Sequence, residues 1–300
     1  MAKVFMTSAT GYIGEAVANE FKKHGYEVIA LARSEESAKR LEKRGFGTAR
    51  GDIKQPNSFL SAIGDADVVI HTASTGDSDF AKADQLATEA ILATLENSGK
   101  TFVYTSGIWL LGNTGAEPAD ESAPLKPIKM VEFRAELEKK ILEFQKRGVK
   151  TIIMRPAVVY DASENGVIGG FIKSAKEDGF AKYIGNGQNR LSVIHIDDVA
   201  SAYYLAVQKS SGGTVFHIST DEQITYRELA DIAAEIAGVP GKVQSWPVED
   251  AAKAFGPFLD GFLLDQHIVS TNTKKQLGWQ AKIQNIRDGL KKPALAAVDP

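Results

Sequence analysis

The first half of the chain alternates short apolar runs with longer helical segments, and this alternation constrains the fold more than any other feature. Six runs have the composition of β-strands: Lys3–Thr7, Glu27–Ala32, Gly47–Arg50, Asp67–Thr72, Thr101–Ser106 and Thr151–Arg155. Four helical segments lie between them: Gly11–His24, Ser34–Arg44, Asp79–Asn97 and Ile128–Arg147. The residues Val68–Ile70 and Phe102–Tyr104 are continuously apolar, as in strands that are buried on both faces. The pattern predicts an α/β fold, a doubly wound parallel sheet with helices on both faces.

The rhythm changes after about residue 160. Short strands at Leu191–Ile196, Thr214–Ile218 and Val243–Trp246 mix with helices at Asp197–Lys209, Tyr226–Ala237 and Ile283–Leu290. Because 300 residues are enough for roughly two domains, we expect a doubly wound domain over residues 1–160 and a smaller α+β lobe over 161–300. The segment of about 191–218 is expected to return to the first domain.

The composition is that of a globular protein and excludes several classes. The chain has no cysteine, which excludes a disulfide scaffold, thiol catalysis and thiolate metal sites. The 35 basic and 38 acidic residues give a net charge of −3 without a basic block, so no nucleic-acid or lipid-binding surface is expected. No His, Asp or Glu cluster has metal-ligand spacing. Without a signal-peptide pattern or an apolar run of roughly 20 residues, we expect a cytoplasmic protein with no membrane partner.

The first strand leads directly into T-S-A-T-G-Y-I-G, residues Thr7 to Gly14, and then into a helix. A strand, a glycine turn and a helix N-terminus provide the close backbone approach and the free N–H groups that a pyrophosphate needs. Ser8 stands where the tight turn prefers a glycine, whereas Gly11 and Gly14 are kept. We therefore expect weakened rather than abolished dinucleotide binding.

The end of the second strand bears on the choice of cofactor. It has no Asp or Glu to bind a ribose 2′-hydroxyl, and it carries Arg33 followed by Ser34. A guanidinium matches the geometry of a 2′-phosphate with paired hydrogen bonds, so the sequence favours NADP(H) over NAD(H). The alternative is that Arg33 is a solvated residue at the start of a helix.

Further motifs follow in order along the chain: Gly51-Asp52-Ile53, V-V-I-H-T-A-S (Val68–Ser74), R-P-A-V-V-Y (Arg155–Tyr160), V-I-H-I-D-D-V-A (Val193–Ala200) and L-G-W (Leu277–Trp279). With the glycine turn, they resemble the short-chain dehydrogenase/reductase superfamily, specifically its extended branch, the NAD-dependent epimerase/dehydratase family. The resemblance covers nearly the whole chain and implies an NAD(P)-dependent oxidoreductase.

The resemblance also implies a set of cofactor-binding residues. They are Thr10, Gly11, Tyr12, Ile13 and Gly14 at the pyrophosphate, Arg33 and Ser34 at the adenine ribose, Asp52 and Ile53 at the adenine, Thr72, Ala73, Ser74, Thr105 and Arg134 along the cofactor, and Ala157 and Val158 beside the nicotinamide.

The catalytic residues typical of that family are altered together. Members use a Ser or Thr after the fifth strand and a Tyr four residues before a Lys, in which the Tyr transfers a proton and the Lys lowers its pKa. No tyrosine lies between Tyr104 and Tyr160, so no register supplies that pair. In the family an acidic residue usually lies four residues beyond the Lys. If Glu138 is that residue, Met130 occupies the tyrosine position and Arg134 the lysine position.

The serine position falls on Gly107, and Ser106 is its neighbour. Arg134 can hold a ribose hydroxyl or stabilise an oxyanion but cannot act as a general base. Candidate substitute proton donors are Asp77, Asp79, Tyr160, Asp161 and Tyr12.

The substrate pocket is expected to be apolar. Trp109 is either a pocket wall or core, and the run Phe255–Leu264 adds aromatic residues to Phe171 and Tyr160. Arg190 resembles the family position near the distal part of the substrate, where it either binds an anionic group or is an ordinary loop cation.

Three functions remain open. The first is an NADP-dependent oxidoreductase acting on a carbonyl or hydroxyl of an apolar or aromatic small molecule, with atypical catalytic residues. The second is a redox-silent isomerase, lyase or cyclase, and the third is a non-catalytic NADPH sensor. By analogy with relatives that pair through the helix over Ile128–Arg147, we expect a homodimer.

Overall fold

The computed structural model describes residues 1–291. The chain divides into two compact units. The first comprises Met1–Ser106, Phe133–Arg155 and Val199–Phe216, and the second comprises Gly107–Glu132, Pro156–Asp198 and the chain from His217 onward. Neither unit is a continuous stretch of sequence.

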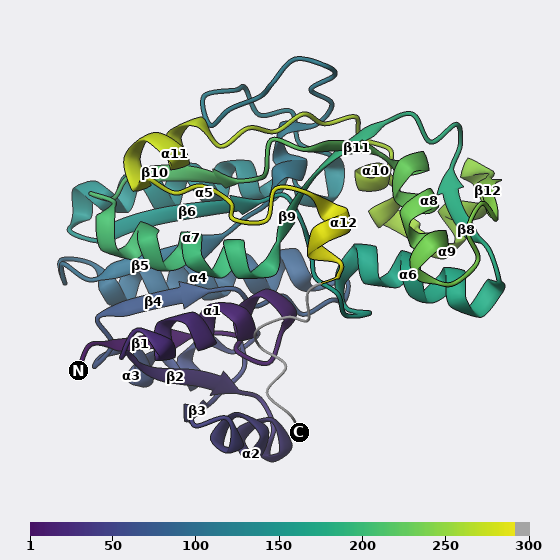
Figure 1. Ribbon diagram of the computed structural model, residues 1–300. Helices are drawn as coiled ribbons and strands as arrows, with labels where there is room; N and C mark the ends of the chain where they lie inside the picture. Colours follow the sequence, from purple (N-terminus) through teal and green to yellow (C-terminus); the bar gives the residue numbers. More distant parts are fainter. Residues whose placement is uncertain (292–300) are drawn as a thin grey trace. The chain divides into compact units, whose positions relative to one another are not determined.

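The first unit is built on a seven-stranded sheet in the order β10-β6-β5-β4-β1-β2-β3 (Figure 1). Its strands are β1 (Lys3–Met6), β2 (Glu27–Ala32), β3 (Gly47–Arg50), β4 (Val68–His71), β5 (Thr101–Thr105), β6 (Lys150–Pro156) and β10 (Thr214–Ile218). The pairs from β3 to β6 are parallel. Because β1 lies between β2 and β4, the strand order reverses there, which is where open α/β sheets bind ligands.

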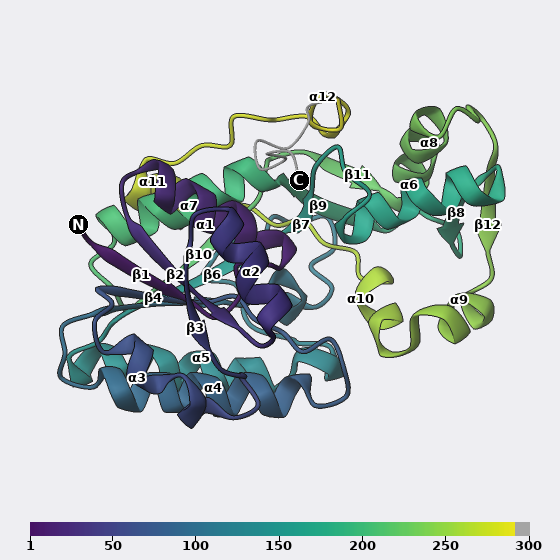
Figure 2. The ribbon, with the colours of Figure 1, turned by 90° about the horizontal axis from the view of Figure 1, so that it is seen from below.

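Helices cover both faces of this sheet. They are α1 (Tyr12–Lys23), α2 (Glu35–Lys43), α3 (Leu60–Ile63), α4 (Phe80–Leu95), α5 (Phe133–Glu143) and α7 (Ile196–Lys209), with short 3₁₀ turns η1 (Pro56–Ser58) and η4 (Phe144–Arg147). Figure 2 shows α1 and α7 on one face and α3, α4 and α5 on the other. The α4–α5 face packs on a core that includes Phe5, Phe59 and Ile91, all at most 1% exposed. The doubly wound fold predicted from the alternation of apolar runs is confirmed.

The second unit combines two small sheets with helices. Its strands are β7 (Val158–Tyr160), β8 (Ala181–Ile184), β9 (Arg190–His195), β11 (Gln223–Thr225) and β12 (Val243–Trp246), in sheets of order β11-β9-β7 and β12-β8. Its helices are α6 (Gly166–Asp178), α8 (Tyr226–Ile236), α9 (Val248–Phe255), α10 (Leu259–Phe262), α11 (Thr271–Leu277) and α12 (Ile286–Gly289), with 3₁₀ turns η2 (Ile108–Leu111), η3 (Lys129–Val131) and η5 (Gly256–Phe258). This is the α+β lobe expected from the sequence.

Two sequence-based expectations differ from the structure. The first is the domain boundary, which we expected at residue 160, with the lobe over 161–300, a range that extends beyond the described residues. In the structure, Gly107–Glu132 also belongs to the second unit. The segment has no periodicity, and contacts to distant residues hold it, including the bridge between Ala119 and Ile268. Helix α6 was not expected, because its three glycines lower helix propensity. Packing overrides that propensity: a Cβ on Gly169 would overlap with the backbone of Glu164.

Candidate functional site

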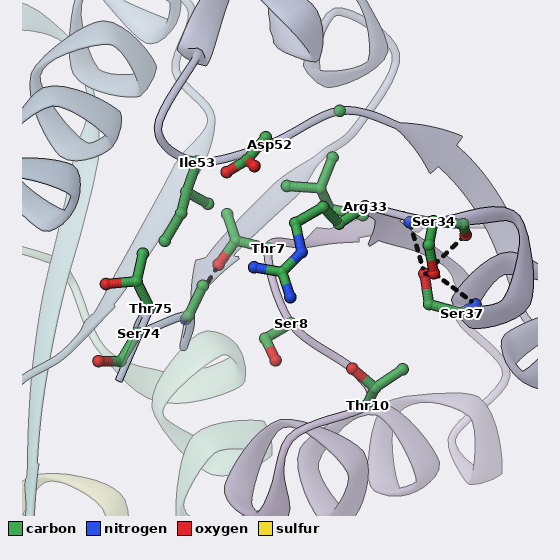
Figure 3. A pocket seen from close by; sticks show the side chains of 13 residues that line it. Thr7, Ser8, Thr10, Arg33, Ser34, Ser37, Asp52, Ile53, Ser74 and Thr75 are labelled. Atoms are coloured by element: carbon green, nitrogen blue, oxygen red, sulfur yellow. Dashed lines mark hydrogen bonds between the residues drawn. The ribbon is translucent and has the colours of Figure 1, made fainter. Parts of the chain in front are cut away.

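A cavity of about 230 Å³ opens in the first unit where β1, β2, β3 and β4 end (Figure 3). It is lined by Thr7, Ser8, Thr10, Leu31, Arg33, Ser34, Ser37, Gly51, Asp52, Ile53, Ala73, Ser74 and Thr75. Seven of these lining residues carry hydroxyl groups, and Arg33 is the one cation among them. The carboxyl ends of parallel strands on both sides of the strand-order reversal meet here. The cavity therefore has the place of a nucleotide site and a lining suited to an anionic, hydroxyl-rich ligand.

The glycine turn brings α1 close to the cavity. A Cβ on Gly14 would overlap with the carbonyl oxygen of Ser8, which accepts a hydrogen bond from Oγ1 of Thr72 at 2.9 Å. Gly11 is the N-cap of α1 and provides no side-chain cap, so the first N–H groups of this 12-residue helix receive no hydrogen bond from a capping side chain. Such N–H groups at the positive end of the helix dipole favour a phosphate. Ser8 in place of the first glycine is compatible with the turn.

Arg33 is the cation of the cavity. Its side chain is exposed and, in residues 1–291, forms no ion pair. Figure 3 shows the guanidinium directed into the cavity toward Ser8. Beside it, Ser34 caps α2, because Oγ of Ser34 accepts from N of Ser37 at 3.1 Å while N of Ser34 donates to Oγ of Ser37 at 3.0 Å. The guanidinium and the two serines therefore form one polar corner of the cavity.

The loops after β3 and β4 form the opposite part of the cavity and are joined by an ion cluster. Nζ of Lys54 lies 2.8 Å from Oδ2 of Asp77 and 2.9 Å from Oδ2 of Asp79. The hydrogen bond from Lys54, supported by one from Thr75, lowers the pKa of Asp77 to about 2. Asp77 is therefore ionised at neutral pH, which argues against its use as the substitute proton donor.

A buried polar network extends from the cavity wall into the core. Oγ1 of Thr7 accepts from the backbone N–H groups of Thr72 and Ala73, so its own proton goes to Nδ1 of His71 at 2.9 Å. Nε2 of His71 then carries the ring proton and donates to Oδ1 of Asp84 at 3.2 Å. The other carboxylate oxygen of Asp84 accepts from Tyr104 at 2.9 Å and from Nη2 of Arg134 at 3.0 Å.

Asp84 is held as an anion in this network. Burial opposes its charge, but the hydrogen bond from His71 and the charge of Arg134 outweigh it and hold the pKa of Asp84 below its ordinary value. Burial raises the pKa of Tyr104 well above its ordinary value. Tyr104 and Arg134 therefore remain protonated donors that satisfy a buried carboxylate.

The residues at the altered catalytic positions lie in both units. Arg134 is in α5 of the first unit, and Met130 is half-buried in η3 of the second. Ser106 is 6% exposed, and its Oγ is buried without a hydrogen-bond partner in the described chain. Thr105, the last residue of β5, is half-buried, and its Oγ1 accepts from the phenol of Tyr203 at 2.8 Å.

The second unit contains the aromatic residues that the sequence assigned to the substrate. Trp109 lies edge-to-face with Phe262 at 6.0 Å and with Phe258 at 6.4 Å between ring centroids, and Phe171 contacts Phe262 at 6.3 Å. A Cβ on Gly261 would overlap with the indole of Trp109, so this glycine lets the ring lie against the backbone. Trp109 is half-buried and Phe258 is 46% exposed, so the cluster reaches the surface of its unit.

Two other expected substrate residues have protein partners. Arg190 forms a two-point ion pair with Asp265, with Nε to Oδ1 at 2.8 Å and Nη2 to Oδ2 at 2.6 Å. Tyr160 is fully buried, edge-to-face with His195 and 3.4 Å from the carbonyl oxygen of Asn285. Burial raises the pKa of Tyr160 above its ordinary value. The positive charge of Arg190, by contrast, is neutralised by Asp265.

The structure brings together seven of the sequence-predicted cofactor residues in the cavity lining: Thr10, Arg33, Ser34, Asp52, Ile53, Ala73 and Ser74. Gly11 is the N-cap of α1, Tyr12, Ile13 and Gly14 lie in its first turn, and Thr72 follows β4. Ala157 and Val158 lie in the second unit. The other six lining residues were not among the predicted cofactor residues: Thr7, Ser8, Leu31, Ser37, Gly51 and Thr75. The spacing of Ser37, three residues after the N-cap Ser34, was the available signal for that residue.

Residues 1–291 contain no group of three or more His, Asp or Glu side chains arranged to hold a metal ion. Their helices also include none with the length and hydropathy needed to cross a bilayer.

Comparison with known proteins places the chain in a family. Residues 4–219 match the model of the NAD dependent epimerase/dehydratase family. An uncharacterized protein of Saccharomyces cerevisiae is 33% identical over 93% of this chain and 94% of its own length. A 4-hydroxy-2-methyl-3-oxo-4-farnesyl-3,4-dihydroquinoline-1-oxide ketoreductase of Stigmatella aurantiaca is 24% identical over 84% of this chain and 78% of its own.

Among solved structures, UDP-glucose 4-epimerase of Thermotoga maritima has the same fold, with a TM-score of 0.80, 21% identity and coverage of 96% of each chain. The predicted family is thus confirmed, and with it the assignment as an NAD(P)-dependent oxidoreductase. The chain belongs to the NAD dependent epimerase/dehydratase family.

Proposed function

We propose that the protein is an NADP-dependent oxidoreductase that acts on a carbonyl or hydroxyl group of an apolar or aromatic small molecule. The single observation that carries the cofactor preference is the exposed guanidinium of Arg33, which is directed into a hydroxyl-lined cavity and is unpaired in residues 1–291. An unpaired cation in a nucleotide cavity favours the cofactor with the additional phosphate.

The residues present fit the cofactor. The uncapped N-terminus of α1 and the turn around Gly14 would hold the pyrophosphate, and Arg33, Ser34 and Ser37 the 2′-phosphate. Asp52 and Ile53 would border the adenine. When bound, NADPH would supply a hydride to the carbonyl carbon, and the protein must supply a hydrogen-bond donor for the carbonyl oxygen, on which negative charge develops.

The proposed substrate class rests on the second unit. The cluster of Trp109, Phe171, Phe258 and Phe262 offers aromatic surface, and the charge of Arg190 is neutralised by Asp265. An apolar carbonyl compound fits these side chains better than a phosphorylated sugar. The similarity to a quinoline ketoreductase supports the same class.

The assembly is proposed to be a homodimer in the cytoplasm. Helices α4 and α5 pack side by side, with Phe80 edge-to-face with Phe133 at 5.7 Å, and Leu86 on α4 is 42% exposed. Multi-angle light scattering of the full chain tests this assembly. A monomeric mass at a protein concentration of about 50 μM would contradict it.

Titration of the full chain with NADPH and NADH, followed by cofactor fluorescence, tests the proposed cofactor. We expect Arg33→Ala to weaken NADPH binding by about 10- to 100-fold and NADH binding by less than about 2-fold. Arg40→Ala, at an exposed arginine of α2 that does not line the cavity, is the matched control. Equal losses for both cofactors would refute the preference, and NADPH oxidation with acetophenone and related aryl ketones then tests turnover.

A further inference from the structure

The end of β5 presents two hydroxyl groups in succession, on Thr105 and Ser106. Since successive side chains of a strand point to opposite faces, they have different surroundings. Oγ of Ser106 is buried, so a ligand arriving at the sheet edge cannot reach it without a rearrangement. Thr105 is half-buried and accessible. Of the two, Thr105 is the hydroxyl that can touch a ligand.

Thr105 lies at the edge of the sheet that carries the cofactor cavity. Strand β5 pairs with β4 in parallel, with Tyr104 opposite His71, so Thr105 is one residue beyond the level of His71. Ala73, Ser74 and Thr75, which follow β4, line the cavity. Thr105 is therefore on the strand next to the cavity wall, at the same end.

The hydrogen bond from Tyr203 determines whether the Thr105 hydroxyl is a donor or an acceptor toward a ligand. Tyr203 is fully buried in α7, and Thr105 is the partner of its phenol, at 2.8 Å. A buried phenol proton left without an acceptor would cost about 1–3 kcal/mol, so Tyr203 donates and Thr105 accepts. Burial also raises the pKa of Tyr203 above its ordinary value, which keeps it a donor at working pH.

The proton of Thr105 is thereby directed elsewhere. A hydroxyl has one proton, and its oxygen already accepts from Tyr203, so the Thr105 proton points away from that bond. Within residues 1–291 no side chain or carbonyl accepts it in a hydrogen bond. Thr105 is thus a donor held ready for an acceptor that comes from outside the protein.

We infer that Thr105 is the hydrogen-bond donor that polarises the substrate carbonyl, in place of the missing serine at position 107, and that Tyr203 is the residue that positions it. This inference rests on the proposed function. No proton leaves Thr105 in this role, because the hydroxyl only stabilises the developing negative charge on the oxygen, as an oxyanion-hole donor does. The alkoxide formed by hydride transfer to the carbonyl carbon takes its proton from solvent water. Tyr203 acts only through Thr105.

The test uses a reporter that needs no turnover. The absorption of 4-(dimethylamino)cinnamaldehyde, an aromatic aldehyde, moves to longer wavelength when its carbonyl oxygen accepts a hydrogen bond. We expect this shift on binding to the NADP⁺-loaded full chain, its loss in Thr105→Val, its retention in Thr105→Ser and a smaller shift in Tyr203→Phe. With substrate, Thr105→Val should lower kcat/KM about 100-fold, and Tyr203→Phe should lower kcat about 10-fold with KM unchanged.

Tyr204→Phe is the matched control, because Tyr204 is the next tyrosine on α7 and stacks on His24 through its ring, at 3.7 Å between centroids. It should leave the shift as in the wild type. No shift in the wild type, or the same shift in Thr105→Val, would overturn the inference. NADPH titration of the wild type tests the proposed function independently of the Thr105 inference. If Tyr203→Phe folds poorly, the comparison of Thr105→Ser with Thr105→Val still tests the inference.

Discussion

Arg134 donates from both Nε and Nη2 to a single carboxylate oxygen of Asp84, at 3.2 and 3.0 Å. This pair ties α5 to α4 and fixes the side chain that stands in the family's lysine position. Since the guanidinium is committed to Asp84, its role in binding a ribose would use the remaining N–H groups only.

Removing the anion of this pair should destabilise the protein strongly. Asp84→Asn leaves Arg134 without its counter-charge and turns an amide NH₂ toward donors, so we expect a loss of about 3 kcal/mol in the free energy of unfolding. Urea denaturation at pH 7 measures it. Glu136→Gln, in the exposed pair of Glu136 with Lys139 on the same helix, should cost less than about 0.5 kcal/mol. Similar losses for the two variants would contradict a structural role for the buried pair.

The contribution of Asp84 to the free energy of unfolding should decrease at acidic pH. Its pKa is lower in the folded protein than the ordinary value of 3.8, so the unfolded chain binds the proton more readily. The stabilisation is therefore present above pH 3.8 and is lost as the pH falls through the lower, folded-state pKa. Urea denaturation from neutral to acidic pH should show the gap between wild type and Asp84→Asn narrowing below pH 3.8. A difference in stability that widens on acidification would mean that folding raises the pKa of Asp84, which would contradict this prediction.

The turn between β1 and α1 should not tolerate a side chain at Gly14. A Cβ would overlap with the carbonyl of Ser8, and Oγ1 of Thr72 lies 3.0 Å from the same position. We expect Gly14→Ala to cost about 1–3 kcal/mol and to weaken NADPH binding at least about 10-fold, because the N-terminus of α1 must move away. Gly170→Ala, in the interior of α6 with no atom within 4 Å of the added carbon, should instead stabilise the protein slightly. Unchanged NADPH affinity in Gly14→Ala would disagree with the proposed pyrophosphate position.

The ion cluster of Lys54 with Asp77 and Asp79 should tighten cofactor binding, since it joins two loops of the cavity. We expect Lys54→Met to weaken NADPH binding about 3-fold at low ionic strength, and this difference should disappear in 1 M NaCl, where screening acts over roughly 3 Å. Fluorescence titration at the two salt concentrations measures it. Lys82→Met, at an exposed lysine near the start of α4, controls for net charge. A loss that is independent of salt would point to a direct contact with the cofactor instead.

The sheet was predictable because its information is local. Its strands over Glu27–Ala32, Gly47–Arg50 and Thr214–Ile218 lie where the sequence pattern predicted them, and so does Val243–Trp246 in the second unit. The glycine turn and the start of α2 at Ser34 were also predictable, since capping and turn chemistry are written in adjacent residues. The seven predicted cofactor residues that line the cavity were implied by the resemblance to the family, not by such local chemistry.

What could not be predicted depends on long-range contacts. Ser106 and Thr105 are neighbours in sequence, and only Tyr203, almost a hundred residues away in the chain, distinguishes their hydroxyls. The pairing of Arg190 with Asp265, which removes its charge, is equally non-local. In each case a distant side chain determines whether a polar group is available to a ligand.

The chain passes from one unit to the other after residues 106, 132, 155, 198 and 216. No single cut therefore releases either unit as an intact polypeptide, and exchanging the second unit with that of a relative would require replacing three separate segments at once. A nascent chain also cannot complete the first unit until residues near 216 have been made, so its central sheet must wait for its last strand, β10. Changes in substrate preference are thus expected to arise by substitutions within loops rather than by recombination of whole domains.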